Sequence, residues 1–438
     1  VSAQLAGRLR VRWQNVLPFK FLGGLLTLGG GLTLGREGPS VQIGAAVGQG
    51  FAELGHRPFT ERKFLVSSGA AAGLAAAFNA PIAGVVFALE ELHRNFSPVV
   101  LVSATAAAFA AVFTAGTVLG IRPVLLVKGR DILPLGYYGL LVALGIVTGL
   151  SGVLFNRCIL WGKSLYARLR LHWAWCGLLP FALTAAACLL CGELFGSGEP
   201  MIFYSMGDNP SPGALIGLYA AKLALLALCF GSGLPGGIFF PLLVLGSLVG
   251  NVFGQAAVST GLMEPQYVTS LALMAMTGHF SAIVRSPLTG ILLISEMTGS
   301  FAFMLPLGLV AMTAYVVAES FRSEPIYESL QKGLLSSSSD APGHEAARSA
   351  SPRDRMLVEF GVENLSPADG RTIAEILWPE DSLVIAVKRG SGEIVPSGQV
   401  RLMAGDYLVV LIPRGAMREA QELLENLTKG NGGNAARP

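Results

Sequence analysis

Apolar residues dominate long, almost uncharged segments through the first three quarters of the chain. The clearest segments are 64–89, 95–127, 132–156, 223–263 and 297–321. A membrane-spanning helix needs about 20 predominantly apolar residues, so each of these segments is long enough to cross a bilayer. The pattern predicts an all-α polytopic membrane protein with about a dozen helices, several of them too short to span.

The longest of these segments, 223–263, contains a break. Its 41 residues exceed one spanning helix, and the run GSGLPGGIFFP at 231–241 interrupts it with glycines and prolines. Irregular backbone at membrane depth is tolerated only where it is buried in protein or lines a water-filled cavity. Residues 231–241 are therefore a candidate functional site.

The apolar part contains an internal repeat. NAPIAGVVFALEE (79–91) aligns with RSPLTGILLISEM (285–297), and GREGPSVQIGAAVG (35–48) aligns with GIFFPLLVLGSLVG (237–250). The aligned pairs include Pro81 with Pro287, Glu90 with Glu296, Gly35 with Gly237, and Pro39 with Pro241. The two offsets, 206 and 202 residues, nearly agree. Repeated halves with matching Gly/Pro breaks are typical of transporters that bind substrate where broken helices meet.

A second kind of segment begins near residue 330. We expect a membrane domain at 1–331, a small, polar, flexible linker at 332–354 and a small α+β domain at 355–427, followed by a disordered tail at 428–438. In the small domain the pattern predicts strands at 356–360 and 382–390, two strands within 399–413 around a Gly-Asp turn, a short helix at 370–377 and an amphipathic helix at 414–427.

Composition supports the membrane assignment and removes several other classes. The chain is 52% hydrophobic and only 13% charged, with 55 glycines, whereas soluble proteins carry about 25% charged residues. The net charge of +3 is scattered, which argues against nucleic acid. The five cysteines lie in or beside apolar segments and are interpreted as packing residues. We find no enzyme motif, and expect no metal, no cofactor and no enzymatic activity.

Each repeat has a glycine-rich entry followed by proline, at 35–39 and 236–241. Proline suits the first turn of a helix, so both motifs predict helix N-termini inside the membrane. Such an end presents free N–H groups and a partial positive charge, which together bind anions. Backbone donors solvate chloride without trapping it beside a full positive charge.

Glu37 stands at the first of these N-termini. Its carboxylate is itself an anion suited to the site, so it competes with the transported anion until a proton neutralises it. One residue is then both gate and proton carrier. The alternative is a helix-start glutamate that faces water.

Other polar residues leave two interpretations open. Glu90 and Glu91 either form a solvated pair at the membrane edge or act inside the protein, and Glu296, the repeat mate of Glu90, is expected to be structural. Arg36 and Lys20 flank the first break, where they either snorkel or attract anions. Tyr327 follows the last span, where a tyrosine is usually an interfacial anchor.

Together these motifs resemble the CLC chloride channels and transporters. GREGPSVQIG (35–44), GAAAGLAAAFNAPIAGVVFALEE (69–91), GSGLPGGIFFP (231–241), SPLTGILLISEMT (286–298) and PIY (325–327) occur in the family's order. The resemblance implies a homodimer in the lipid bilayer of the cell membrane, with a separate multi-pass pore in each subunit built from inverted repeats of tilted and partial helices.

The resemblance also implies roles for individual residues. Glu37 matches the gating glutamate, and Glu91 matches the internal proton-transfer glutamate of exchangers. The amides of Ile238 and Phe239 and the hydroxyl of Tyr327 match groups that hold the central anion. The amides around Arg36, Glu37 and Gly38 match the outer anion site. The family's first helices and their GSG-x-P signature have no counterpart; GSGEP at 196–200 lies at the corresponding place in the second repeat.

The C-terminal segment resembles a different family. PEDSLVIAVKRGSGEIVPSGQVRLMAGDYLVVL (379–411) is similar to the TrkA-C ligand-binding module of potassium-transport regulators. This resemblance implies a cytoplasmic, dimeric regulatory domain with a small-molecule ligand. The alternative is a domain that only stabilises the dimer.

The function predicted from the sequence is exchange of chloride for protons. A passive voltage- or pH-gated chloride channel on the same scaffold is the nearest alternative, and Glu91 argues against it because channel members of the family generally lack a carboxylate there. A potassium-linked sensor or scaffold with a degenerate pore is a third possibility. The choice between chloride and nitrate stays open, since the segment that helps to choose has no counterpart in the chain.

Overall fold

The computed structural model describes most of the chain as two compact units, Val1–Ser338 and Ser339–Pro438. The described residues are 1–5, 11–94, 96–120, 123–125, 131–169, 172–207, 210–338, 355–364, 366–379, 382–389, 392–413, 423–424 and 427–428. Each unit has its own hydrophobic core.

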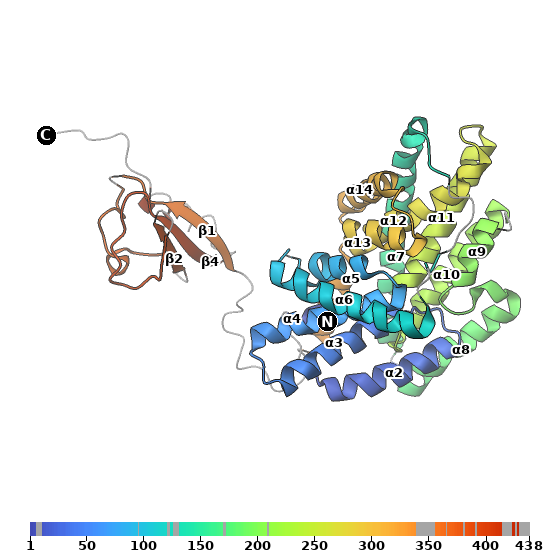
Figure 1. The fold of residues 1–438 in the computed structure, drawn as a ribbon, viewed down its shortest axis with the longest axis horizontal. Coiled ribbons are helices and arrows are strands. Elements are labelled where there is room, and N and C mark those ends of the chain that lie inside the picture. Colours follow the sequence, from blue (N-terminus) through green and yellow to red (C-terminus); the bar gives the residue numbers. More distant parts are fainter. Residues whose placement is uncertain are drawn as a thin grey trace. The chain divides into compact units, whose positions relative to one another are not determined.

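The first unit is helical throughout its described residues (Figure 1). Its first half contains α1 (Ser2–Leu5), α2 (Trp13–Gly29), α3 (Glu37–Leu54), α4 (Phe59–Phe78), α5 (Pro81–Phe87), the π-helix η1 (Ala88–His93) and α6 (Pro98–Leu119). Then follow α7 (Tyr138–Leu169), α8 (Trp173–Leu190), the 3₁₀ turn η3 (Gly192–Leu194), α9 (Glu199–Gly207), α10 (Pro212–Gly231), α11 (Phe239–Ser259), α12 (Val268–Val284), α13 (Pro287–Thr298), α14 (Met304–Ser320) and α15 (Ile326–Ser338).

Five of the described helical segments are long and apolar enough to cross a membrane, and others, such as α13, are too short. The predicted all-α polytopic class is therefore confirmed. The expected break in 223–263 separates α10 from α11. Proline at the first helical position opens α5, α10 and α13, where its missing N–H costs no hydrogen bond.

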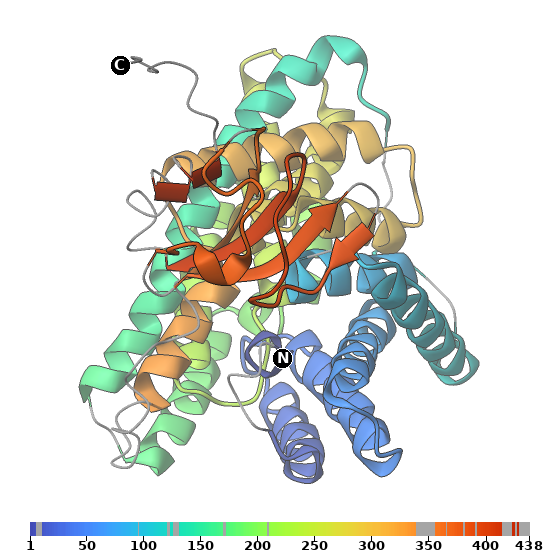
Figure 2. The same cartoon turned by 90° about the vertical axis from the view of Figure 1, so that its left-hand side faces the viewer.

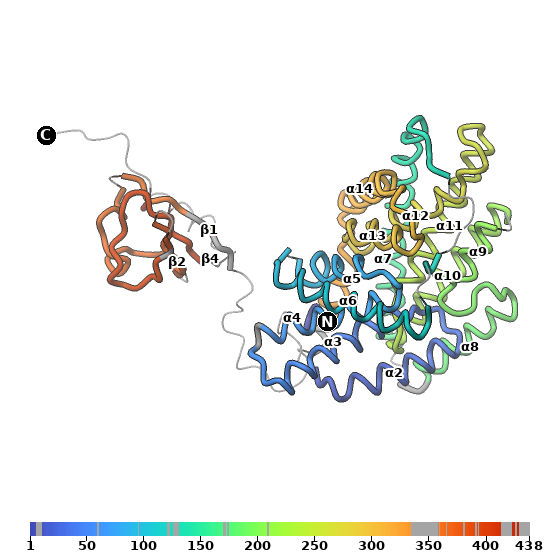
Figure 3. Tube along the Cα trace, viewed as in Figure 1, coloured from blue at the N-terminus to red at the C-terminus, as the bar shows by residue number. Residues whose placement is uncertain are grey.

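The two repeats pack in the same way. In the first, Gly44 and Gly48 of α3 lie directly against the backbone of α4 at Gly69 and Leu65, so no side chain fits between the helices. In the second, Gly246 and Gly250 of α11 approach the backbone of α12 equally closely. Small residues allow such close approach in membranes. The trace in Figure 3 shows α3 running beside α4, and α11 beside α12.

α12 forms the centre of the first unit. Of its 17 residues, 16 are buried, and Thr269 is half-buried. Most of them are apolar, and the others are serine, threonine, histidine and glycine. α7, α11, α13 and α14 pack around it. A helix that is apolar on all sides belongs in the interior of a bundle, and α12 serves as the packing centre of the second repeat.

The second unit is a four-stranded antiparallel sheet with the order β1-β4-β2-β3 (orange to red in Figure 2). Its strands are β1 (Arg355–Gly361), β2 (Leu383–Arg389), β3 (Gly392–Ile394) and β4 (Tyr407–Pro413). Val358 of β1 and Val384 of β2 both pair with Val410 of β4. This register directs one set of alternate residues into the core.

Two expectations for this unit are wrong. Residues 399–404 form no strand: Val400 and Leu402 exchange single backbone hydrogen bonds with Ile373 and Arg371 across an isolated bridge. The helix expected at 370–377 is one 3₁₀ turn, Ile373–Glu375, closed by a Thr372–Glu375 capping box. These segments pair with each other, which local patterns could not show. Most of the helix expected at 414–427 lies outside the described residues.

Candidate anion and proton site

The two glycine-rich breaks meet in the middle of the first unit. The amide of Gly35 donates to the carbonyl of Gly237 at 2.7 Å, and the amide of Gly237 donates back at 2.8 Å. A Cβ on Gly38 would lie 2.8 Å from the Cα of Gly237. This contact places the N-termini of α3 and α11 side by side. Two free helix ends at one point concentrate backbone donors and positive potential.

Glu37 fills the space between these helix ends. It is the first residue of α3 and only 1% exposed. Its carboxylate lies over Gly35 and beside Pro241 of α11. Neither carboxylate oxygen has a hydrogen-bond partner among the described residues; the amides of Glu37 itself and Phe240 face it without meeting hydrogen-bond geometry. The water-facing alternative for Glu37 is therefore wrong.

Ile238 and Phe239 form the start of α11, with exposed fractions of 1% and 3%. The ring of Phe239 packs against Phe78, Phe87 and Phe280 with centroid distances of 5.3, 6.3 and 4.8 Å. These apolar neighbours leave the backbone amides of the helix start as the local polar groups. Such an environment suits an anion without a tight cationic partner.

Tyr327 lies close to Glu91. It is the second residue of α15 and is half-buried. The carboxylates of Glu91 and Glu37 both act electrostatically on its hydroxyl. The structure therefore brings Tyr327 together with Glu91.

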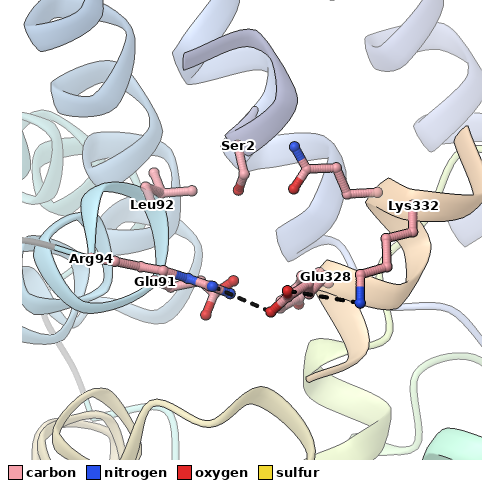
Figure 4. A pocket seen from close by; sticks show the side chains of 8 residues that line it. Ser2, Glu91, Leu92, Arg94, Glu328 and Lys332 are labelled. Carbon is pink, nitrogen blue, oxygen red and sulfur yellow. Dashed lines mark hydrogen bonds and ion pairs between the residues drawn. The ribbon is translucent and has the colours of Figure 1, made fainter. Parts of the chain in front are cut away.

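Glu91 lies in the π-helix η1. It is 5% exposed and accepts a hydrogen bond of 3.2 Å from Ser286 Oγ. Single π-turns inside longer helices occur frequently at functional sites. Glu91 and Tyr327 line a common cavity of about 230 Å³, whose wall Figure 4 shows. Because the Glu91 side chain is buried, Glu91 is not a solvated residue at the membrane edge.

Glu296 has a structural role, as expected, and Glu90 has the same one. Glu90 accepts from the amides of Leu288 and Thr289 at 3.1 and 2.8 Å, at the start of α13. Glu296 accepts from the amides of Ile82 and Ala83 at 3.0 and 2.8 Å, at the start of α5. Each repeat thus caps the other's helix. The signal was present in the alignment, which pairs these glutamates and the prolines that open both helices.

Three cations lie at different depths. Arg36 is the exposed N-cap residue of α3, and Lys20 of α2 is half-buried. Lys222 of α10 is fully buried and donates to the carbonyls of Leu194 and Gly196 at 3.0 and 2.6 Å. Sequence reasoning missed Lys222, although it follows Lys20 by 202 residues, the offset that separates Gly35 from Gly237. Among the described residues, no His, Cys, Asp and Glu side chains cluster as a metal site.

Comparison with known proteins identifies the family of each unit. Residues 1–319 match the family model of the voltage-gated chloride channels, and residues 357–425 match the TrkA-C domain. The chain therefore belongs to the voltage-gated chloride channel family and carries a TrkA-C domain.

Several relatives in this family have assigned activities. The H⁺/Cl⁻ exchange transporter ClcA of Cronobacter sakazakii is 36% identical over 337 residues, which are 73% of this chain and 70% of the relative. ClcA of Yersinia pestis bv. Antiqua is 37% identical over 351 residues, covering 76% and 71%.

Two solved structures are also similar. One is a slow cyanobacterial Cl⁻/H⁺ antiporter, with a TM-score of 0.70 and 31% identity, covering 76% of this chain and 80% of that one. The other is a CLC-type fluoride/proton antiporter, with a TM-score of 0.61 and 27% identity, covering 71% and 75%.

Proposed function

We propose that this chain is a multi-pass membrane antiporter that exchanges chloride for protons. The observation that carries the proposal is the carboxylate of Glu37, buried between the N-termini of α3 and α11. The exchange activity of the ClcA relatives and of the cyanobacterial neighbour supports the same function.

In the proposed mechanism, Glu37 and chloride compete for one region of positive potential. The ionised carboxylate occupies the helix ends and keeps the anion out. A proton neutralises the side chain, which removes its attraction to the helix ends and lets the anion enter. Chloride and proton occupancy therefore favour each other, and a coupling free energy between two ligands is reciprocal.

Glu91 is proposed to receive protons from the inner solution. A buried carboxylate in a membrane protein is energetically costly, and such residues mark functional sites. Glu91 shares a cavity with Tyr327, and the carboxylates of Glu91 and Glu37 both act on the Tyr327 hydroxyl. A passive channel needs no second buried carboxylate, so the channel alternative is not favoured. The degenerate-pore alternative conflicts with the intact set Glu37, Glu91 and Tyr327.

Chloride is proposed to contact the amides of Ile238 and Phe239 and the hydroxyl of Tyr327 at the centre, and the amides near Arg36 and Gly38 on the outer side. Support comes from the Gly35–Gly237 contact, which brings together the helix starts that carry these amides, and from the place of Tyr327 beside Glu91. Transport requires only binding and proton movement, so we propose no enzymatic reaction.

We further propose a homodimer with cytoplasmic TrkA-C domains that bind a small-molecule ligand. Family membership supports the dimer. α15 carries both Tyr327 and a wall of the Glu91 cavity, and the chain continues from α15 into the TrkA-C domain. If Glu91 faces the inner solution, the domain begins on that side.

Paired chloride and proton fluxes in liposomes test the exchange mechanism. Glu37→Gln mimics the protonated carboxylate and should conduct chloride with no proton coupling and little dependence on pH. Glu91→Gln keeps size and polarity but cannot titrate, so it should lose proton transport while chloride flux continues. Proton-driven chloride accumulation by Glu37→Gln would contradict the gate, and unchanged proton pumping by Glu91→Gln would contradict the relay.

A further inference from the structure

The cavity beside Glu91 contains a group of charged side chains that the exchange mechanism does not use. Arg94, Glu328 and Lys332 line it together with Glu91. A volume of about 230 Å³ is far above the roughly 10–15 Å³ that one water needs. Glu91 is 5% exposed, whereas the side chains of Glu328 and Arg94 are 37% and 53% exposed. The latter two therefore lie between Glu91 and solvent.

Arg94 stands between two carboxylates. It ends the π-helix that carries Glu91, with a left-handed backbone at φ 54°. The charged side chains that act on Glu91 are Arg94, Glu90 and Glu328. The guanidinium nevertheless pairs with Glu328, at 3.3 Å between Nη1 and Oε2. Figure 4 shows this bond from Arg94 to Glu328. Glu91 accepts its hydrogen bond from Ser286 instead.

Glu328 is held in turn from its own helix. Lys332 Nζ lies 4.0 Å from Glu328 Oε1, one turn along α15, and also 2.8 Å from Glu324 Oε1. Glu328 therefore has a cation on each side. This arrangement fixes Glu328 in a position where it draws Arg94 toward α15.

We propose that Glu328 is a positioning residue for proton transfer, which holds Arg94 away from Glu91 and so leaves Glu91 free to accept a proton from the inner solution. Without Glu328, Arg94 would be free to pair with Glu91, the other carboxylate on which its charge acts. An ion pair there would favour the charged form of Glu91 and oppose its protonation. The inference rests on the proposed role of Glu91.

The other polar groups around Glu91 do not compete for this role. Glu90, on the same helix, is occupied by the amides at the start of α13. From α13, Ser286 contributes a neutral hydroxyl, and from α15, Tyr327 contributes another. Ser2 of α1 also lines the cavity and is neutral. Lys332, the other cation that lines the cavity, is held by Glu324 at 2.8 Å. Arg94 is therefore the cation that acts on Glu91 among the described residues.

The test measures proton transport by the full chain in liposomes as a function of inner pH. Glu328→Gln should move the pH of half-maximal proton transport toward acid by about one unit, since a free Arg94 stabilises charged Glu91. Glu324→Gln is the matched control: it removes the same charge and the same Lys332 partner but has no bond to Arg94, so its profile should match the parent chain. Glu328→Asp should shift in the same direction by less.

A double substitution separates positioning from a direct field effect. In an Arg94→Gln background, Glu328→Gln should cause no further acid shift, because no cation remains to be released. An acid shift that persists without Arg94, or no shift in Glu328→Gln itself, would overturn the inference. Glu91→Gln, run in parallel, distinguishes the outcomes: if that variant still pumps protons, the proposed role of Glu91 fails, whatever Glu328→Gln does.

Discussion

Gly35 and Gly237 exchange two backbone hydrogen bonds, each serving as donor and acceptor to the other across 202 residues of sequence. They are equivalent positions of the two repeats, so the contact lies where the halves of the membrane unit meet. A Cβ on Gly237 would lie 2.7 Å from the backbone nitrogen of Gly38, so glycine is required there. The close approach brings the helix ends of both repeats together at the proposed anion site.

Gly35→Ala should weaken proton coupling without removing a titratable group. Its Cβ would collide with the carboxylate of Glu37 and lie 3.2 Å from Pro241 Cδ. Because the carboxylate is the flexible partner, it should be displaced from the helix ends. We expect a lower ratio of protons to chloride in paired flux measurements, between the parent chain and Glu37→Gln.

The control for this change is Gly136→Ala, where no atom lies within 4 Å of the added Cβ. Its flux ratio should equal that of the parent chain. Overpacking at Gly35 also costs about 1–3 kcal/mol, so the melting temperature in detergent should fall. If Gly35→Ala kept the proton-to-chloride ratio of the parent chain, coupling would not depend on this position of the Glu37 carboxylate.

Glu296→Ala and Glu90→Ala should each destabilise the membrane unit. Each removes the acceptor for two amides at the first turn of a helix in the other repeat. Loss of a cap typically costs about 1–2 kcal/mol. Thermal unfolding in detergent measures the effect, and the double variant should be non-additive, since α5 and α13 are in direct contact.

Glu61→Ala is the comparison for these caps. Glu61 is half-exposed and makes a 3.7 Å pair with Arg57 one turn away on the surface, which is worth within about 0.5 kcal/mol. If Glu90→Ala and Glu296→Ala had the same melting temperature as Glu61→Ala, the mutual caps would contribute no measurable stability.

The stability of the TrkA-C domain should fall in acid through Asp406. Burial opposes ionisation of Asp406, but hydrogen bonds from Arg389 at 2.7 Å and from the amide of Met403 outweigh it, and the pKa of Asp406 is lowered. A group whose folded pKa lies below its unfolded value, about 3.9, contributes its full stability above that value. The contribution disappears as the pH falls through the folded pKa.

Asp406→Asn should therefore lower the free energy of unfolding at pH 7 by about 2 kcal/mol, which is typical of hydrogen bonds to charged groups. It should also reduce the loss of stability between about pH 4 and about pH 2, just below the reference pKa of an aspartate. Denaturant unfolding of the domain at several pH values measures both. Asp369→Asn, which weakens one exposed bond to the amide of Ala404, should change the curve much less. If the free energy of unfolding of Asp406→Asn fell in acid as much as that of the parent chain, the pH dependence would come from other groups.

Local patterns identified the helical class and the broken helices because membrane helices must satisfy their own backbone hydrogen bonds and carry long apolar stretches. The same reasoning failed in the small domain. Residues 399–404 have strand-like alternation, but their partner is the irregular segment near Thr372, and only a single bridge forms. Alternation reports which face is buried and says nothing about whether a regular neighbour is present.

The roles of the glutamates divide in the same way. Glu37 could be predicted as an anion competitor because its place at a Gly-Pro helix start is a local property. Glu90 and Glu91 are adjacent in sequence, yet one caps α13 and the other lines a cavity with Tyr327. Consecutive residues on a helix point to different surroundings, so only the packing of the second repeat separates the capping Glu90 from Glu91, the proposed proton carrier.

The sequence by itself determined the membrane class, the two repeats and the glycine- and proline-marked helix ends, since each depends on hydrophobicity and backbone chemistry within a short stretch. The tertiary structure decided the Gly35–Gly237 contact, the mutual caps of Glu90 and Glu296, the buried Lys222 and the pairing of Arg94 with Glu328. These relationships join residues up to 234 positions apart. The packing of the two repeats decides which residues so far apart in sequence become ion-pair or hydrogen-bond partners, and a local sequence pattern does not contain that information.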